Sequence, residues 1–172
     1  MRDPETRLAW STLLESFLPP GPATIGDVGC GTGSVSVLLS REDRRVVGLD
    51  FSAAMVAAAT AKANRSDAPA LFCIADASRP PWTEGRFDVI VVRHVLWAVD
   101  DADAAIEAWC RLLVPDGVLL LIEGHWGEVG ITALEAEGIV RRHRGEAVVH
   151  RLDDPVLWGG PISDERYLIA IR

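Results

Sequence analysis

Short apolar runs alternate with helical segments along most of the chain. The pattern predicts strands over 24–28, 45–50, 71–75, 87–93 and 118–123, and helices over 4–17, 34–41, 53–63 and 102–113. The segment 87–93 is almost continuously apolar, which is typical of a parallel strand that is buried on both faces. Strands separated by helices predict an α/β domain built on a parallel sheet.

Capping and breaking residues mark the ends of these elements. Ser52 and Asp101 stand directly before helical segments, where their side chains favour an N-cap. Thr132 followed by Glu135 fits a capping box, which predicts a helix to about residue 142. The Pro-Asp-Gly segment 115–117 predicts a turn before the fifth strand.

The last part of the chain follows a different pattern. Segments 147–152 and 167–171 read as strands with no helix between them, so we expect them to pair antiparallel. The predicted fold is therefore α/β and doubly wound: a mostly parallel seven-stranded sheet, an antiparallel C-terminal strand pair, and helices on both faces. One domain is expected over 1–172: an N-terminal helix and short linker (1–22), a core (23–123), and a helix plus antiparallel hairpin (124–172).

Composition and charge restrict the kinds of partner that we expect this protein to bind. The formal net charge of −8 disfavours nucleic acid, and the basic cluster 141–144 is interpreted as a solvated helix end. No apolar run is long enough to span a bilayer, and the N-terminus has no signal-peptide pattern, so we expect a cytoplasmic protein without a membrane partner. Cys30, Cys73 and Cys110 are too widely spaced for a zinc motif, which predicts buried free thiols and no metal.

The segment 27–34 joins the first strand to its helix and carries three glycines at alternate positions, Gly29, Gly31 and Gly33. Glycines let the backbone turn tightly and let a ligand approach closely. Asp27 would repel a pyrophosphate and attract an ammonium group. Ser34 stands where a dinucleotide-binding loop requires Gly or Ala. These two residues disfavour a nicotinamide cofactor.

Asp27, Asp50 and Asp76 close the first three predicted strands. Each one alone is an ordinary cap or turn residue. Together they lie at the carboxyl edge of the sheet, where open α/β sheets bind ligands. A carboxylate at Asp50 can accept hydrogen bonds from both hydroxyls of a ribose, and Asp76 is placed to reach an adenine amino group.

With these features the chain resembles the class I (Rossmann-like) methyltransferases that use S-adenosylmethionine (SAM) and release S-adenosylhomocysteine. The matching segments are 27–34, 50–55, 75–77, 87–92 and 113–118, within a resemblance that covers roughly residues 5–123. Segments 93–99, 157–161 and 164–167 are similar to a subgroup of bacterial small-molecule methyltransferases.

The resemblance implies roles for individual residues. Asp27 and the glycine loop would hold the methionyl end, Asp50 the ribose, and Asp76 with the Ala77 amide the edge of the adenine. Phe51 and Met55 would flank the adenine, although both are equally compatible with core positions. The implied cofactor-binding residues are Asp27, Gly29, Cys30, Gly31, Thr32, Gly33, Asp50, Phe51, Ser52, Met55, Asp76, Ala77 and Arg93.

The acceptor side is predicted from the ends of the fourth and fifth strands. His94 is the candidate general base, with a histidine bonded to backbone as the alternative; Arg93 is expected to offer its backbone carbonyl to the cofactor. The expected substrate-pocket residues are His94, Trp97, His125, Trp126 and Trp158.

Several alternatives stay open from the sequence. The accepting atom (oxygen, nitrogen or carbon) is undetermined, and a homodimer is compatible with the sequence. About 24 residues precede the first strand, where relatives often carry a longer cap. The site is then unusually open, closed by another subunit, or part of a shortened chain. The other functions weighed are a SAM-binding protein without methyl transfer and, with less support, an NAD-dependent oxidoreductase.

Overall fold

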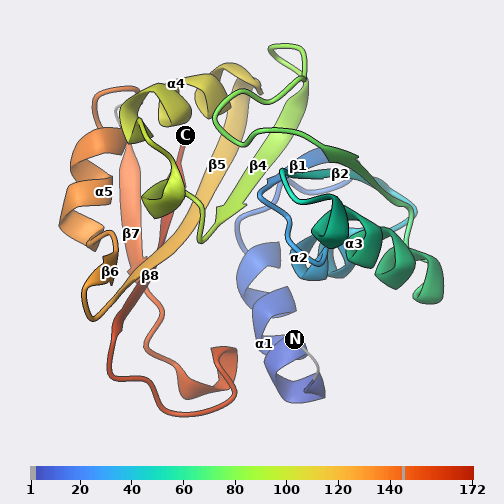
Figure 1. Ribbon diagram of the computed structural model, residues 1–172, viewed down its shortest axis with the longest axis horizontal. Coiled ribbons are helices and arrows are strands. Elements are labelled where there is room, and N and C mark those ends of the chain that lie inside the picture. The colour runs from blue at the N-terminus through green and yellow to red at the C-terminus, as the bar shows by residue number, and fades with distance from the viewer. Residues whose placement is uncertain (1–2, 145) are drawn as a thin grey trace.

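The computed structural model describes residues 3–144 and 146–172 (Figure 1). Helices and strands alternate along most of the chain, as predicted. The helices are α1 (Pro4–Glu15), α2 (Ser34–Leu39), α3 (Ala53–Arg65), α4 (Ala102–Arg111) and α5 (Ala133–Val140), with 3₁₀ turns η1 (Leu96–Ala98) and η2 (Pro155–Leu157). The strands are β1 (Ala23–Val28), β2 (Arg44–Asp50), β3 (Ala70–Ile74), β4 (Phe87–Arg93), β5 (Leu113–Trp126), β6 (Val129–Gly130), β7 (Ala147–Arg151) and β8 (Glu165–Ile171).

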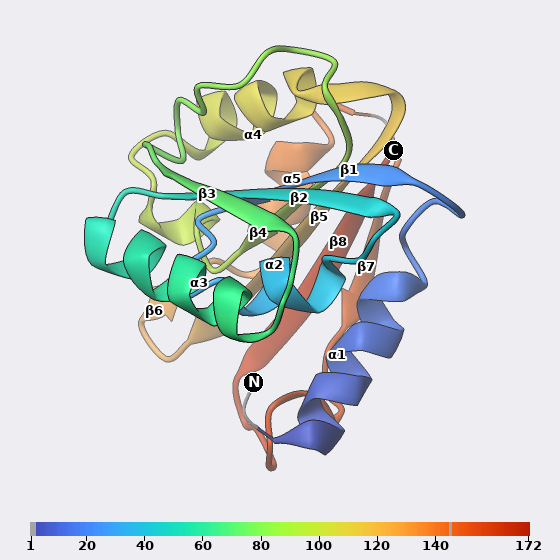
Figure 2. The same ribbon diagram turned by 90° about the vertical axis from the view of Figure 1, so that its right-hand side faces the viewer.

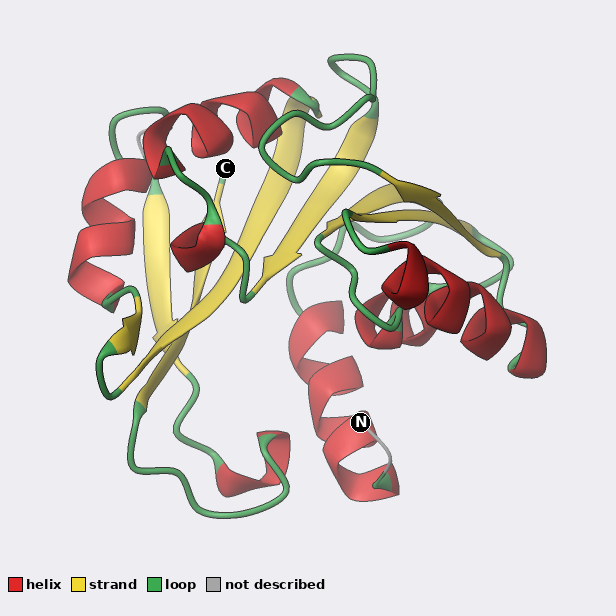
Figure 3. Cartoon of the chain, viewed as in Figure 1, coloured by secondary structure: helices red, strands yellow, loops and turns green. Residues whose placement is uncertain are grey.

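The sheet has the order β3-β2-β1-β4-β5-β8-β7. The pairs β2–β3, β1–β2, β1–β4 and β4–β5 are parallel, whereas β8 pairs antiparallel with both β5 and β7. The predicted doubly wound sheet with an antiparallel C-terminal pair is therefore confirmed. Because β1 to β5 run in the same direction, their carboxyl ends share one edge of the sheet (Figure 3).

Helices cover both faces of the sheet, which explains why the central strands are apolar throughout. On β4, Val89 and Val91 pack with α1 and α2, whereas Ile90 and Val92 pack with α4 and α5. Successive side chains of a strand point to opposite faces, so a strand between two helical layers is buried on both. Figure 2 shows α4 on one side of β1, β2 and β3, with α2 and α3 on the other.

Two details of the sheet differ from the prediction. The segment 115–117 is not a separate turn but part of the long strand β5. Phe87 pairs with Leu113 and Val89 with Val118, so the extra residues of β5 bulge opposite Asp88. A bulge keeps a strand continuous while absorbing residues that have no partner. The second difference is β6, an unpredicted strand of 2 residues that pairs with β5 and makes the sheet eight-stranded.

The predicted caps are present. Ser52 and Asp101 accept hydrogen bonds from the backbone at the starts of α3 and α4, and Thr132 with Glu135 forms the capping box of α5. The three cysteines are free thiols, with Cys30 buried and the other two partly exposed. Within the described residues, no helix is long and apolar enough to cross a membrane.

The N-terminal helix meets the loop between β7 and β8 below the carboxyl edge of the sheet. The loop between β7 and β8 carries η2 toward α1 (Figure 1). The Trp10 indole donates a hydrogen bond to the Leu157 carbonyl over 2.6 Å, and its ring meets that of Trp158 edge-on at 5.3 Å. The N-terminal helix is thereby fixed against the C-terminal hairpin.

Candidate functional site

The glycine loop adopts a backbone that only glycine accepts readily. Gly29, Gly31 and Gly33 have φ values of 69°, 53° and 70°, all in the left-handed region. A Cβ on Gly29 would lie 2.2 Å from a methyl carbon of Val95, so this glycine also permits close packing. A Cβ on Gly31 would meet nothing within 4 Å, because this position borders open space. The loop therefore lines a pocket at its middle glycine.

This pocket has a volume of about 250 Å³ and lies between the glycine loop and the end of β4. It contains a carboxylate and a guanidinium, from Asp27 and Arg93. Its lining residues are Asp27, Gly29, Cys30, Gly31, Thr32, Ser34, Val35, Arg93 and His94. Two charges of opposite sign in one small pocket complement a zwitterion.

The Asp27 carboxylate is buried at the end of β1 and accepts a hydrogen bond from the Ser36 hydroxyl of α2. Burial raises the pKa of Asp27 to about 6, partly opposed by that hydrogen bond and by the positive charge of Arg93. At neutral pH the group is mostly ionised and only partly compensated. Such a carboxylate favours a cationic ligand.

Asp50 ties the end of β2 to the glycine loop. Its Oδ2 accepts from the Gly31 amide and its Oδ1 from the Ser52 amide, both at 2.9 Å. Each carboxylate oxygen has a second lone pair available for a ligand. Asp76, at the end of β3, is exposed and accepts from the amide and hydroxyl of Ser78, each at 2.8 Å. Asp76 thus forms the turn that follows its strand.

Apolar side chains stand exposed beside Asp50. Phe51 is 83% exposed and Met55 is 42% exposed, so neither is a core residue. Ile74, at the end of the neighbouring β3, is 60% exposed. An apolar surface next to a carboxylate at a strand end suits a flat heterocycle attached to a sugar.

The remaining residues predicted around the loop have partners within the protein. Burial raises the pKa of the Cys30 thiol, so Cys30 is an unreactive packing residue. Lys62 of α3 donates to the hydroxyls of Thr32 and Ser34 at 3.0 and 2.7 Å. The Ala77 carbonyl accepts from the Trp109 indole at 2.7 Å, which fixes the turn after β3.

Arg93 ends β4 with its side chain directed inward, which the sequence did not predict. Its guanidinium lies 4.6 Å from the Trp10 ring centroid and 5.9 Å from that of Trp158. Its Nε is buried and has no hydrogen-bond partner in residues 3–144 and 146–172. Two aromatic faces stabilise the cation, and Asp27 attracts it across the pocket. The side chain, rather than only the carbonyl, therefore belongs to the site.

His94 follows in a strained conformation, with φ of 60°. Burial, together with the positive charges of Arg93 and Arg166, lowers the pKa of His94 to about 4. Its buried Nδ1 has no hydrogen-bond partner among the described residues. The imidazole is neutral at pH 7, and in the part of the chain that the structure describes its Nδ1 makes no hydrogen bond to the backbone.

The three predicted tryptophans lie near His94 or near each other. The His94 ring meets Trp126 edge-on at 4.8 Å and lies 6.3 Å from Trp158, while Trp97 lies 6.4 Å from Trp126. His125 does not join them. It precedes Trp126 on β5, so its side chain points to the opposite face of the sheet.

Some residues of this region were missed by the sequence analysis. Ser36 and Trp10 look like ordinary helix residues, and their contacts with Asp27 and Arg93 depend on tertiary packing. Glu123 is a fully buried carboxylate near the end of β5, and burial raises its pKa to about 7. An acid that closes an apolar strand was a visible signal, because isolated carboxylates are rarely buried.

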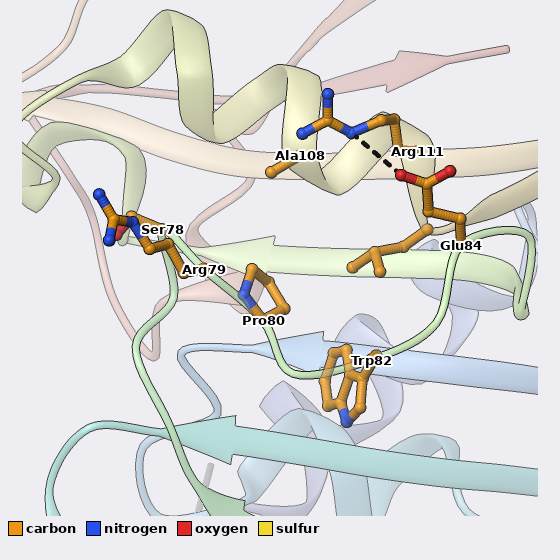
Figure 4. A pocket seen from close by; sticks show the side chains of 8 residues that line it. Ser78, Arg79, Pro80, Trp82, Glu84, Ala108 and Arg111 are labelled. Atoms are coloured by element: carbon orange, nitrogen blue, oxygen red, sulfur yellow. Dashed lines mark ion pairs between the residues drawn. The ribbon is translucent and has the colours of Figure 1, made fainter.

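A second pocket, of about 260 Å³, lies between the β3–β4 loop and α4 (Figure 4). The ion pair between Arg111 and Glu84, at 3.5 Å, crosses it, and Trp82 lies at its other end. It includes none of the predicted site residues. Its lining residues are Ser78, Arg79, Pro80, Trp82, Glu84, Ala108, Arg111 and Leu112.

Comparison with known proteins agrees with this geometry. The profile of a methyltransferase domain matches residues 26–121, which span the glycine loop and strands β1 to β5. The chain belongs to the class I SAM-dependent methyltransferase family. The expected resemblance is therefore confirmed.

The chain is also similar to individual methyltransferases. It is 32% identical over 108 residues to a demethylmenaquinone methyltransferase of Thermus thermophilus, covering 62% of this chain and 49% of that protein. It is 35% identical over 105 residues to a trans-aconitate 2-methyltransferase of Streptomyces avermitilis, covering 59% of this chain and 39% of that protein. The chain thus spans at most about half the length of these relatives.

A solved structure confirms the fold. The [4+2]-cyclase SpnF superposes with a TM-score of 0.76 at 22% identity, covering 84% of this chain and 59% of that one. At this identity the likeness concerns the fold alone.

Proposed function

We propose that this chain transfers the methyl group of SAM to a small-molecule acceptor. The observation that carries the proposal is the pocket in which Asp27 and Arg93 face each other behind the glycine loop. SAM supplies a methyl group that its sulfonium has already activated, so the protein has to bind, align and exclude water. The experiment that tests the proposal is S-adenosylhomocysteine release from SAM with candidate small-molecule acceptors.

The pocket between the glycine loop and the end of β4, called the methionyl pocket from here on, suits the amino-acid end of SAM. The Asp27 carboxylate would attract its ammonium group, and the Arg93 guanidinium would attract its carboxylate. Gly31 leaves room there, because a Cβ at this position would point into open space. The neighbouring backbone of Gly29, Cys30, Thr32 and Gly33 would complete this end of the site.

The other end of SAM would lie along the strand ends toward β3. Asp50 would accept from the ribose hydroxyls with the lone pairs that its amide partners leave unused. The exposed side chains of Phe51 and Met55 would cover the adenine, and Ser52 starts the helix beneath it. Asp76 and Ala77 would read the adenine edge.

The acceptor would approach from the end of β4 and β5. His94 lines the methionyl pocket and touches Trp126, so its ring stands between the proposed cofactor and acceptor sites. Trp97 is 44% exposed and offers apolar surface to an acceptor. Trp126 and Trp158 would form the wall behind it, whereas His125 lies on the opposite face of the sheet and would not contact the acceptor.

The relatives support a small acceptor, because the matched proteins are named for demethylmenaquinone and trans-aconitate. The proposed domain has a cofactor-binding core over residues 23–123. The N-terminal helix precedes this core, and the acceptor-side helix and hairpin follow it. The domain would act as a monomer or as a homodimer.

A second candidate function is SAM binding without methyl transfer. The likeness to a [4+2]-cyclase favours keeping it, because this fold also supports a reaction named for cyclisation. The two functions differ in one product: methyl transfer releases S-adenosylhomocysteine, and SAM binding alone does not. An NAD-dependent reaction is disfavoured by the carboxylate of Asp27, which would repel a pyrophosphate.

SAM affinity should depend on pH through Asp27. The ammonium group binds the ionised carboxylate, so affinity is full above the Asp27 pKa of about 6 and is lost as pH falls through it. At pH 5 about one carboxylate in ten is ionised, and we expect a SAM dissociation constant about tenfold higher than at pH 7.5. Calorimetric titrations at the two pH values measure the difference.

The Asp27→Asn variant is the control for this titration. Asparagine has no charge to lose, so its weaker SAM binding should not change between pH 5 and 7.5. It also separates the effect from Glu123, whose pKa burial raises to about 7. A wild-type affinity that stays constant over this range would contradict the role of Asp27.

A further inference from the structure

Glu123 is a buried carboxylate that the proposed function leaves unexplained. It lies on β5 with 0% of its surface exposed. Its Oε1 accepts from the backbone amides of Val95 and Leu96, both at 2.7 Å, and its Oε2 has no partner within the described residues. Burying a carboxylate costs free energy, and these two hydrogen bonds offset part of that cost.

The two amides belong to the turn that carries His94. The His94 amide still continues the sheet, donating to the Ile122 carbonyl at 2.9 Å. At His94 the backbone switches to its left-handed conformation, and the next two amides then converge on Glu123. Such a conformation persists for a bulky residue only where its surroundings hold it.

The same turn also contacts the glycine loop. Val95 occupies the space that a side chain on Gly29 would need. Glu123 therefore holds a segment that touches the loop on one side and presents His94 to the pocket on the other. These contacts connect three strand ends: β1 through Gly29, β4 through His94, and β5 through Glu123.

We propose that Glu123 is a positioning residue: its carboxylate holds the Val95–Leu96 turn so that the His94 imidazole stays between the methionyl pocket and the rings of Trp126 and Trp158. Its effect on turnover rests on the proposed function. Its effect on the position of His94 does not, and the two are measured separately.

The position of His94 can be followed without an acceptor. The ring lies edge-on to Trp126, so its carbon-bound protons should be displaced by ring currents in a ¹H–¹³C NMR spectrum. The chain has 4 histidines, and the signal absent from His94→Asn identifies residue 94. Arg93 and Arg166 are the charged groups that shift its pKa, so spectra are recorded at pH 7.5, where the ring is neutral.

Three variants test the contact. Glu123→Leu removes both acceptor contacts and should return the His94 signals toward those of a histidine in the unfolded chain. Glu123→Gln keeps a neutral acceptor at the same place and should retain most of the displacement. Asp88→Ala is the matched control, since Asp88 also accepts from a backbone amide, that of Thr24 at 2.8 Å, at the opposite end of the sheet. It should leave the His94 signals unchanged.

Turnover gives the second readout. In Glu123→Leu we expect kcat to fall at least about tenfold while the dissociation constant of S-adenosylhomocysteine changes by less than about threefold. Glu123→Gln should recover much of the rate. If Glu123→Leu does not fold, Glu123→Asp replaces it, because its shorter side chain cannot reach both amides.

The outcomes separate the two proposals. Undisplaced His94 signals in folded Glu123→Leu, with displaced signals in the wild type and in Asp88→Ala, support the positioning role whether or not the chain methylates. His94 signals that stay displaced in both the Leu and the Asp variant would overturn it. Absent methyl transfer in the wild type would count against the proposed function only.

Discussion

The His94→Asn variant is expected to lower kcat about 100-fold when the acceptor is a hydroxyl, with little change in SAM affinity. A positioned base typically contributes about 10²–10⁴-fold. We expect the low end, because burial and two nearby arginines lower the pKa of His94 to about 4 and weaken it as a proton acceptor. Its Nδ1 is buried and has no hydrogen-bond partner within the described residues, so no protein donor occupies its lone pair.

Asparagine is the sharper substitution at this position. The backbone of His94 has φ of 60°, a conformation that asparagine tolerates better than alanine. His94→Asn therefore removes the base and keeps the turn, whereas His94→Ala changes both. His150→Ala is the matched control, since His150 lies on the edge strand β7 against Phe17.

Turnover and SAM affinity are measured on the same protein. Equal losses in both would show that His94 holds the cofactor and is not a base. If the acceptor is a thiolate or an already neutral amine, no proton has to be removed and the loss should be small.

The Asp50→Ala variant should weaken SAM binding by about ten- to a few hundred-fold. Hydrogen bonds to a charged group contribute roughly 1.5–3 kcal/mol each, and about 1.4 kcal/mol corresponds to a factor of ten. The structure adds an indirect loss, because the same carboxylate fixes the Gly31 amide beside the methionyl pocket. Calorimetry with SAM measures the change.

Asp88→Ala is again the control. Asp88 and Asp50 both accept hydrogen bonds from backbone amides. Asp88, however, lies at the amino end of its strand, away from the site. Both variants should lose some thermal stability, and only Asp50→Ala should lose affinity. A change in SAM affinity below threefold for Asp50→Ala would make Asp50 a strand-end residue only.

The fold follows from the sequence because its signals are local and agree with each other. Apolar runs, N-caps such as Ser52 and the capping box at Thr132 each specify an element, and the alternation of elements specifies a parallel sheet. The bulge around Pro115 was missed, because the Pro-Asp-Gly segment has the composition of a turn. Its strand conformation comes from pairing with β4.

The edge of the sheet that carries the candidate site was predictable for a similar reason. Carboxyl ends of parallel strands share one edge, so the sequence predicts Asp27, Asp50 and Asp76 along it, although it does not predict that only Asp27 of the three lines the pocket. The inward side chain of Arg93 was not predictable, since it depends on Trp10 and Trp158 from the two ends of the chain. The face of His125 could have been derived from strand alternation with Trp126.

The most direct measurement is a thermal-shift comparison of SAM, S-adenosylhomocysteine and NAD on the purified chain. A ligand that binds only the folded state adds about 2.7 kcal/mol of stability at a hundredfold excess over its dissociation constant. SAM or S-adenosylhomocysteine at such an excess should raise the melting temperature, with micromolar affinity, and NAD should not. A rise with NAD and none with either SAM or S-adenosylhomocysteine would contradict the account.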